Sequence, residues 1–149
     1  MFKFRRASNI EKLLSALESS ASFYDFLARH CENPFMLQVY RAGIARRREA
    51  VFALQDFIYH DPSAAALQVD EHRIRSLRES YLLVMRLYTG DDMRCFAKDL
   101  LYTEKLLTGL FSANLLMSRR SDLTSTIAVI VQANRRFQLR LEAVTTATC

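Results

Sequence analysis

Residues 8–58 read SNIEKLLSALESSASFYDFLARHCENPFMLQVYRAGIARRREAVFALQDFI, and this stretch gives the strongest indication of the fold. It opens at Ser8 with the S-x-x-E spacing of a capping box, which predicts a helix over residues 8–30. Asn33 then caps a second helix, expected over residues 33–58, with a proline at its first position. Because only a few residues join the two helices, they should lie antiparallel as a hairpin.

Apolar residues recur at the helical period along both predicted helices, with polar residues opposite, as in amphipathic helices that pack on a core. Three of the inner positions carry no large apolar side chain, two being alanine and one arginine. The inner face of the first helix reads Ile10, Leu14, Leu17, Ala21, Tyr24 and Ala28, and that of the second reads Leu37, Tyr40, Ile44, Arg47, Val51, Leu54 and Ile58.

The rest of the chain repeats the helical pattern. Three further helices are expected, over residues 70–89, over residues 92–117, and from Asp122 onward. No stretch alternates at the period of a strand, and the small-residue link before the third helix is too short to separate two cores. The sequence therefore predicts an all-α protein with a single domain over residues 1–149.

The composition agrees with long helices and also indicates the cellular compartment. Of 149 residues, 50% are hydrophobic and only three are glycine and two proline, which leaves little room for hairpin turns or disorder. The cysteines, Cys31, Cys95 and Cys149, are odd in number and widely spaced, which suits neither a disulfide framework nor a thiolate zinc site. Without a secretory signal or an apolar run long enough to span a bilayer, we expect a cytoplasmic protein with no membrane contact.

Three segments resemble one known family. They are LLSALESSASFYDFLARHCENPFMLQVYRAGIARRREAVFALQDFI (13–58), TGDDMRCFAKDLLYTEKLLTGLF (89–111) and, more loosely, VIVQANRRFQLRLEAV (129–144). These segments are similar to the PA2169-type ferritin-like family, a group of bacterial proteins of unknown function. The resemblance implies a ferritin-like antiparallel four-helix bundle of helices 1, 2, 4 and 5, with helix 3 as an extra crossover helix.

The resemblance also says where a metal would sit. Ferritin-like carboxylate bundles hold two irons with a Glu on each of two helices and a Glu-x-x-His on each of the others. Glu104 is the one carboxylate left at these positions, so we expect neither a functional di-iron site nor any cofactor. The other positions form a degenerate ligand layer of Ala21 on helix 1, Arg47 with Ala50 on helix 2, and Asn134 with Phe137 on helix 5.

Arg47 and Glu104 are both flanked by apolar residues one turn away on each side, which predicts a buried ion pair between them. The alternative is that one of the two side chains extends outward along its aliphatic stem. Tyrosines at helical spacing, such as Tyr24, Tyr40 and Tyr81, predict core packing with a hydroxyl at the edge of the core.

Helix 3 suggests how such a bundle would act, because it is apolar on more sides than one bundle face can bury. We expect a non-enzymatic protein that works by protein–protein association, as a homo-oligomer such as a dimer or with another protein. The expected association surface comprises Leu82, Leu83, Leu115 and Leu116.

Two other functions stay open from the sequence. One is a ferritin-like metal-binding oxidase or iron-handling stress protein with ligands outside the usual set, which bound metal would reveal. The other is a nucleic-acid-binding bundle, suggested by a net charge of +5 and a pI near 9.4. Nucleic acid is the less expected partner, since the arginines are scattered and no interleaved aromatic platform accompanies them.

Overall fold

The computed structural model describes residues 8–58, 67–88, 93–115 and 122–147. Within these ranges the secondary structure is entirely helical, with no strand, so the expected all-α class is confirmed. The helices are α1 (Asn9–Arg29), α2 (Pro34–Gln55), α3 (Glu71–Leu87), α4 (Met93–Ser112) and α5 (Asp122–Ala147).

Side chains next to the first turns explain where three helices begin. Ser8 Oγ accepts a hydrogen bond from the backbone N–H of Glu11 at 3.3 Å, and Asn33 Oδ1 accepts one from Phe35 at 3.0 Å. Asp70 Oδ1 does the same for α3. Each cap satisfies an N–H that has no partner inside its helix, so local sequence fixes these starts.

The helix ends differ from the sequence prediction. The second helix stops at Gln55 rather than near Ile58, and α4 stops at Ser112 rather than near residue 117. Beyond α4, the Asn114 amide donates to the Gln68 carbonyl at 3.0 Å and accepts from the Gln68 N–H at 2.8 Å. These two hydrogen bonds to the segment before α3 give the end of α4 an alternative to continuing the helix. The expected end of the third helix at residue 89 and the expected start of the fourth at residue 92 lie outside the described residues.

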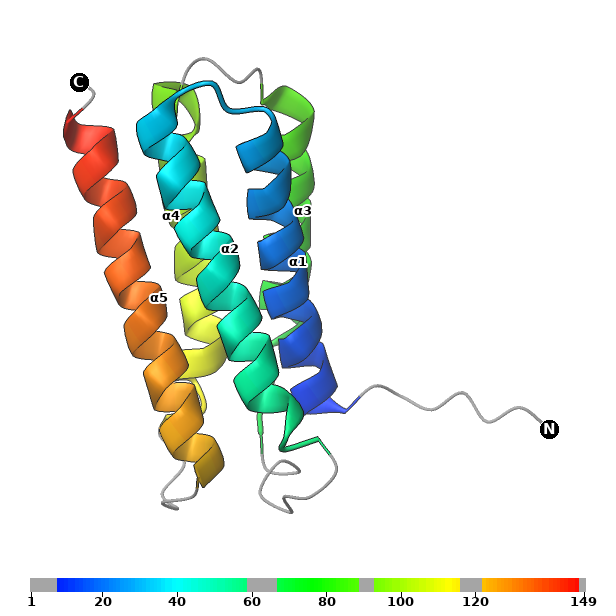
Figure 1. The fold of residues 1–149 in the computed structure, drawn as a ribbon. Coiled ribbons are helices and arrows are strands. Elements are labelled where there is room, and N and C mark those ends of the chain that lie inside the picture. Colours follow the sequence, from blue (N-terminus) through cyan, green and yellow to red (C-terminus); the bar gives the residue numbers. More distant parts are fainter. Residues whose placement is uncertain (1–7, 59–66, 89–92, 116–121, 148–149) are drawn as a thin grey trace.

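We call α1, α2, α5 and α4 the ring, because each of them contacts the next, and α3 packs beside it between α1 and α4 (Figure 1). Around the ring α1 contacts α2, α2 contacts α5, α5 contacts α4, and α4 contacts α1, while α3 packs on α4 and α1. In Figure 1, α1 and α5 run upward and α2 and α4 run downward, so ring neighbours are antiparallel. As a result α2 and α4 face each other diagonally across the centre.

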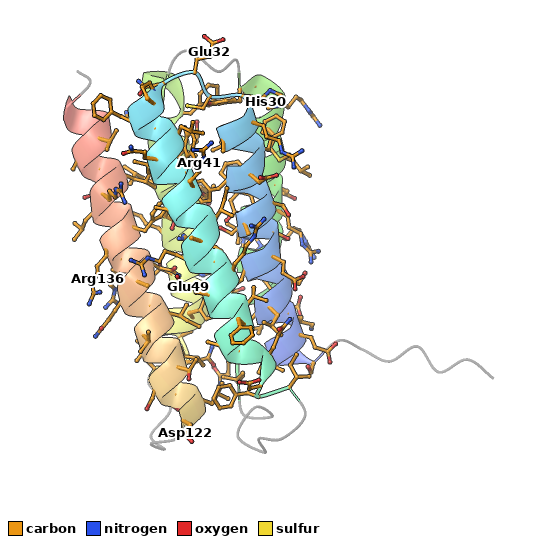
Figure 2. The ribbon with its side chains drawn as sticks, viewed as in Figure 1. His30, Glu32, Arg41, Glu49, Asp122 and Arg136 are labelled. Atoms are coloured by element: carbon orange, nitrogen blue, oxygen red, sulfur yellow. The ribbon has the colours of Figure 1, made fainter. Side chains whose placement is uncertain are left out.

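Buried apolar residues from all five helices form one cluster along the axis of the ring. Charged side chains such as Arg41, Glu49 and Arg136 are exposed on the outside (Figure 2). None of the described helices is long and apolar enough to cross a membrane.

Candidate functional site at the centre of the bundle

A pair of opposite charges lies at the centre of the ring. Arg47 on α2 donates from Nη2 to Oε2 of Glu104 on α4, and both side chains have no exposed surface. The two helices are diagonal in the ring, so this pair spans the core. The ion pair inferred from the apolar flanks is present, and neither side chain extends to the surface.

Two aromatic rings enclose the guanidinium. Arg47 Cζ lies 4.7 Å from the ring centroid of Phe137 on α5 and 5.6 Å from that of Tyr24 on α1. The two rings meet edge to face, with centroids 5.3 Å apart. Each of the four ring helices therefore contributes one side chain, and the aromatic faces favour the positive charge.

Tyr24 also contacts the carboxylate, which the sequence did not indicate. Its hydroxyl donates to Glu104 Oε1, the oxygen that Arg47 does not contact. Tyr24 had been expected to place its hydroxyl at the edge of the core, whereas the structure places it at the centre. Periodicity identified the correct face of α1. It does not show how far the Tyr24 ring reaches from that face toward α4.

The electrostatics of the site keep Arg47 and Tyr24 in their usual protonation states. Burial lowers the pKa of Arg47, but the Glu104 carboxylate, together with smaller contributions from Tyr24 and Tyr81, outweighs it, and the net pKa lies above the ordinary value. Burial and then the Glu104 charge raise the pKa of Tyr24 well above its usual range. Arg47 therefore stays charged, and Tyr24 stays protonated as a hydrogen-bond donor.

Several buried polar atoms lack a hydrogen-bond partner among the described residues. Two belong to Arg47 itself, Nε and Nη1, so the guanidinium uses only part of its donor capacity. Others are Thr108 Oγ1 and Asn134 Nδ2. Each unpaired donor costs free energy, so the pair sets which helices face each other more than it adds stability.

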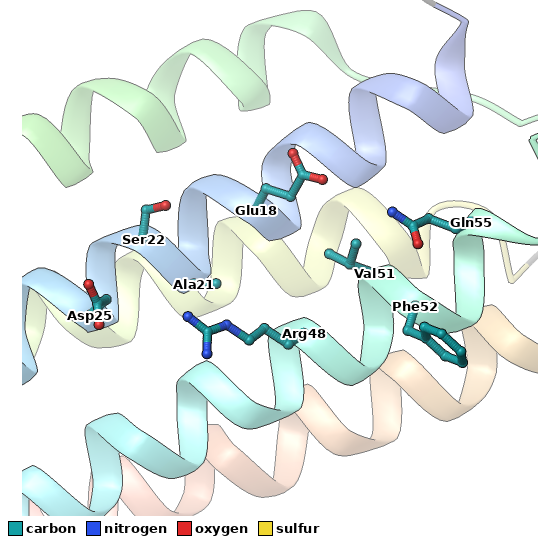
Figure 3. A pocket seen from close by; sticks show the side chains of 8 residues that line it. All are labelled: Glu18, Ala21, Ser22, Asp25, Arg48, Val51, Phe52 and Gln55. Atoms are coloured by element: carbon teal, nitrogen blue, oxygen red, sulfur yellow. The ribbon is translucent and has the colours of Figure 1, made fainter.

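The residues of the expected ligand layer line different parts of the bundle. Phe137 contacts Arg47, but Ala21 lines a groove of about 370 Å³ between α1 and α2, opposite Arg48 (Figure 3). Ala50 and Asn134 line a separate hollow between α2 and α5. An apolar stripe of a helix is wide, so a position on the stripe can face a neighbouring helix instead of the axis.

The donor set at the centre fits a metal poorly. Glu104 is its only carboxylate, and each of its oxygens already accepts a hydrogen bond. A divalent cation would have to displace Tyr24 and overcome the charge of Arg47. In the described part of the chain, no three His, Cys, Asp or Glu side chains are grouped where they could hold a metal ion.

The residues of the expected association surface differ in their exposure. Leu82 is 60% exposed and Leu83 is 51% exposed on the outer side of α3, and Leu87 one turn further is 54% exposed. Leu115 is half-buried and packs against the core instead, because the chain turns after α4 ends. Leu116 lies outside the described residues. We define the leucine patch as Leu82, Leu83 and Leu87.

Comparison with known proteins gives no further identification. The chain has no significant match to a protein-family model, to a curated protein or to a solved structure. The functional conclusion therefore depends on the geometry of the bundle centre and of its surface.

Proposed function

We propose that this chain is a non-enzymatic, ferritin-like bundle in which the Arg47–Glu104 pair takes the place of a di-iron site. In this proposal the protein acts by association through the leucine patch, first of all as a homodimer. The observation that carries the proposal is the exposure of three large apolar side chains on one face of α3, outside the four-helix ring.

The patch is surplus to the needs of the fold. The opposite face of α3 already supplies a complete core stripe, made of Ile74, Leu77, Tyr81 and Val84. Scattered exposed leucines are common, but three exposed leucines within two turns of one helix are a concentration of the kind that marks an interaction site. Removing that surface from water would favour association by about 25 cal/mol per Å² before the costs of association.

A second copy of the chain is the simplest partner for this face. Two copies related by a two-fold axis would bring both patches together, so each would bury the other with no further chain required. Because α3 lies outside the ring, its outer face can approach another helix without disturbing the core. The arginines beside the patch, Arg78 and Arg86, are exposed and suit the polar rim of such an interface.

Light scattering at micromolar concentration tests the proposal. The native protein should have twice its chain mass of 17.2 kDa, and the double variant Leu82→Glu, Leu83→Glu should have the mass of one chain. A matched control is Val129→Glu, Leu139→Glu, which adds the same charges at two exposed apolar positions of α5. The control should stay dimeric. A monomeric native protein, or equal dissociation of both variants, would contradict the proposal.

A further inference from the structure

The seam between α2 and α5, which faces the viewer in Figure 1, is hollowed in two adjoining places. The upper hollow is about 130 Å³ and the lower about 180 Å³, and both are lined by Arg46 of α2 and Ala133 of α5. The two hollows therefore form one continuous groove along the helices, which we call the seam groove. It lies across the ring from α3.

Small side chains produce the groove. Ala42, Ala50 and Ala53 of α2 face Ala133 of α5 there, and none of these fills the space between the two helix backbones. The floor of the lower hollow is completed by Ile130, whose side chain is buried. The lower hollow is mainly apolar and has room for an aliphatic side chain.

Positive charge gathers at the upper hollow. Arg46, Arg136 and Arg140 all line it, and all three are exposed. Arg46 contacts Glu49 at 3.5 Å, whereas the ion pairs among the described residues include neither Arg136 nor Arg140. Two guanidinium groups are thus free to bind carboxylates, to which their planar donor geometry is suited.

The lower hollow contains a buried donor without a partner. Asn134 lines this hollow and is 2% exposed, and its Nδ2 makes no hydrogen bond within the described parts of the chain. A buried amide N–H₂ that lacks an acceptor costs free energy, and an acceptor from a bound molecule would recover it. A peptide carbonyl is such an acceptor.

We propose that the seam groove binds an acidic peptide segment of a partner protein. Carboxylates of the segment pair with Arg136 and Arg140, one aliphatic side chain enters the lower hollow, and a backbone carbonyl accepts from Asn134. Glu49 lines the lower hollow, and its negative charge repels carboxylates there. The acidic part of the segment therefore binds at the upper hollow. The leucine patch is on α3 across the ring, so both surfaces can be occupied together.

Nucleic acid fits the seam groove less well. Single-stranded nucleic acid needs aromatic faces on which bases stack. The aromatic residue that lines the groove is Phe137, which is 4% exposed and covers Arg47 with its ring. An acidic peptide requires only the charges, the apolar hollow and the donor that are present.

Fluorescence anisotropy with a fluorescein-labelled peptide of repeated Glu-Asp-Leu tests the proposal on the full chain. We expect saturable binding that Arg136→Glu weakens about tenfold, equivalent to about 1.4 kcal/mol. The matched control is Arg135→Glu, a neighbouring exposed arginine that lines the α4–α5 side instead. Arg135→Glu should change the dissociation constant less than about twofold, because it alters the net charge by the same amount as Arg136→Glu but lies outside the groove.

Two further measurements separate the groove from general charge attraction. Ala133→Leu should fill both hollows and weaken binding without changing net charge, and circular dichroism checks that the variant is folded. A labelled peptide of repeated Gln-Asn-Leu should not bind. Equal losses in Arg135→Glu and Arg136→Glu, no saturation up to about 1 mM, or displacement of the peptide by oligothymidine at equal concentration would each overturn the proposal.

Discussion

At the centre of the bundle two opposite charges are held with no exposed surface, whereas on the outer face of α3 three leucines are each more than half exposed. The central groups have partners within the chain, because Glu104 accepts from Arg47 and Tyr24. The three leucines are not covered by any described part of the single chain. The central charges thus have partners within the chain, whereas the outside of the bundle is where we expect a partner to bind.

The largest expected effect comes from breaking the central pair. Arg47→Met should lower the free energy of unfolding by about 3–5 kcal/mol, because it leaves the Glu104 carboxylate buried and uncompensated. Adding Glu104→Leu should recover most of that loss, since the double variant replaces the pair by apolar groups. Urea denaturation of the two single variants and the double variant measures this. Additive losses in the double variant would show that the two side chains do not act as a pair.

A smaller loss is expected from Tyr24→Phe, which keeps the ring and removes the donor to Glu104. Hydrogen bonds to charged groups contribute about 1.5–3 kcal/mol, so the free energy of unfolding should fall by that amount. Tyr102→Phe is the control, because the Tyr102 side chain on α4 is 51% exposed, and the loss of its hydroxyl should cost little or nothing. If both variants lost the same stability, the Tyr24 hydrogen bond would not be the cause.

Gly43→Ala should disturb the centre indirectly. A Cβ at Gly43 would lie 2.8 Å from Cζ of Phe137, the ring that covers Arg47, so we expect a loss of about 1–3 kcal/mol from overpacking. At Gly109 the added Cβ would meet only the flexible end of Arg73. Gly109→Ala should therefore be near neutral or stabilise α4 by up to about 1 kcal/mol. Thermal unfolding that showed equal losses would contradict the role of Phe137.

The smallest effect on chain stability should come from the leucine patch. Leu82→Glu and Leu83→Glu should change the unfolding free energy of the monomer by no more than about 0.5 kcal/mol, as at other exposed positions. Leu77→Ala, on the inner face of the same helix, should instead cost about 2–5 kcal/mol. Denaturation of dissociated samples measures both. A large loss from the two exposed positions would mean that the patch serves the fold and not a partner.

Local chemistry made much of this fold predictable. The caps at Ser8 and Asn33 are short-range hydrogen bonds, so the sequence shows them directly. The pair of Arg47 and Glu104 was also predictable, because a charge flanked by apolar residues one turn away on each side is drawn into the core and needs a partner.

Features that depend on contacts between distant segments were not predictable. The end of α4 depends on Asn114 binding Gln68, and the central role of Tyr24 depends on how far its ring reaches toward α4. Ala21 lines the groove between α1 and α2, and periodicity gives only the width of a stripe, not which neighbour each position faces. The seam groove was missed for a related reason, since it requires small residues on two helices to meet.

The metal content of freshly purified protein tests the central claim most directly. Elemental analysis for iron, manganese and zinc should find well below one metal per chain, both as purified and after incubation with Fe²⁺ followed by desalting, because Arg47 and Tyr24 already bind both oxygens of Glu104. One or more metals per chain, lost in Glu104→Gln, would contradict the account and favour a metal-binding oxidase or iron-handling protein.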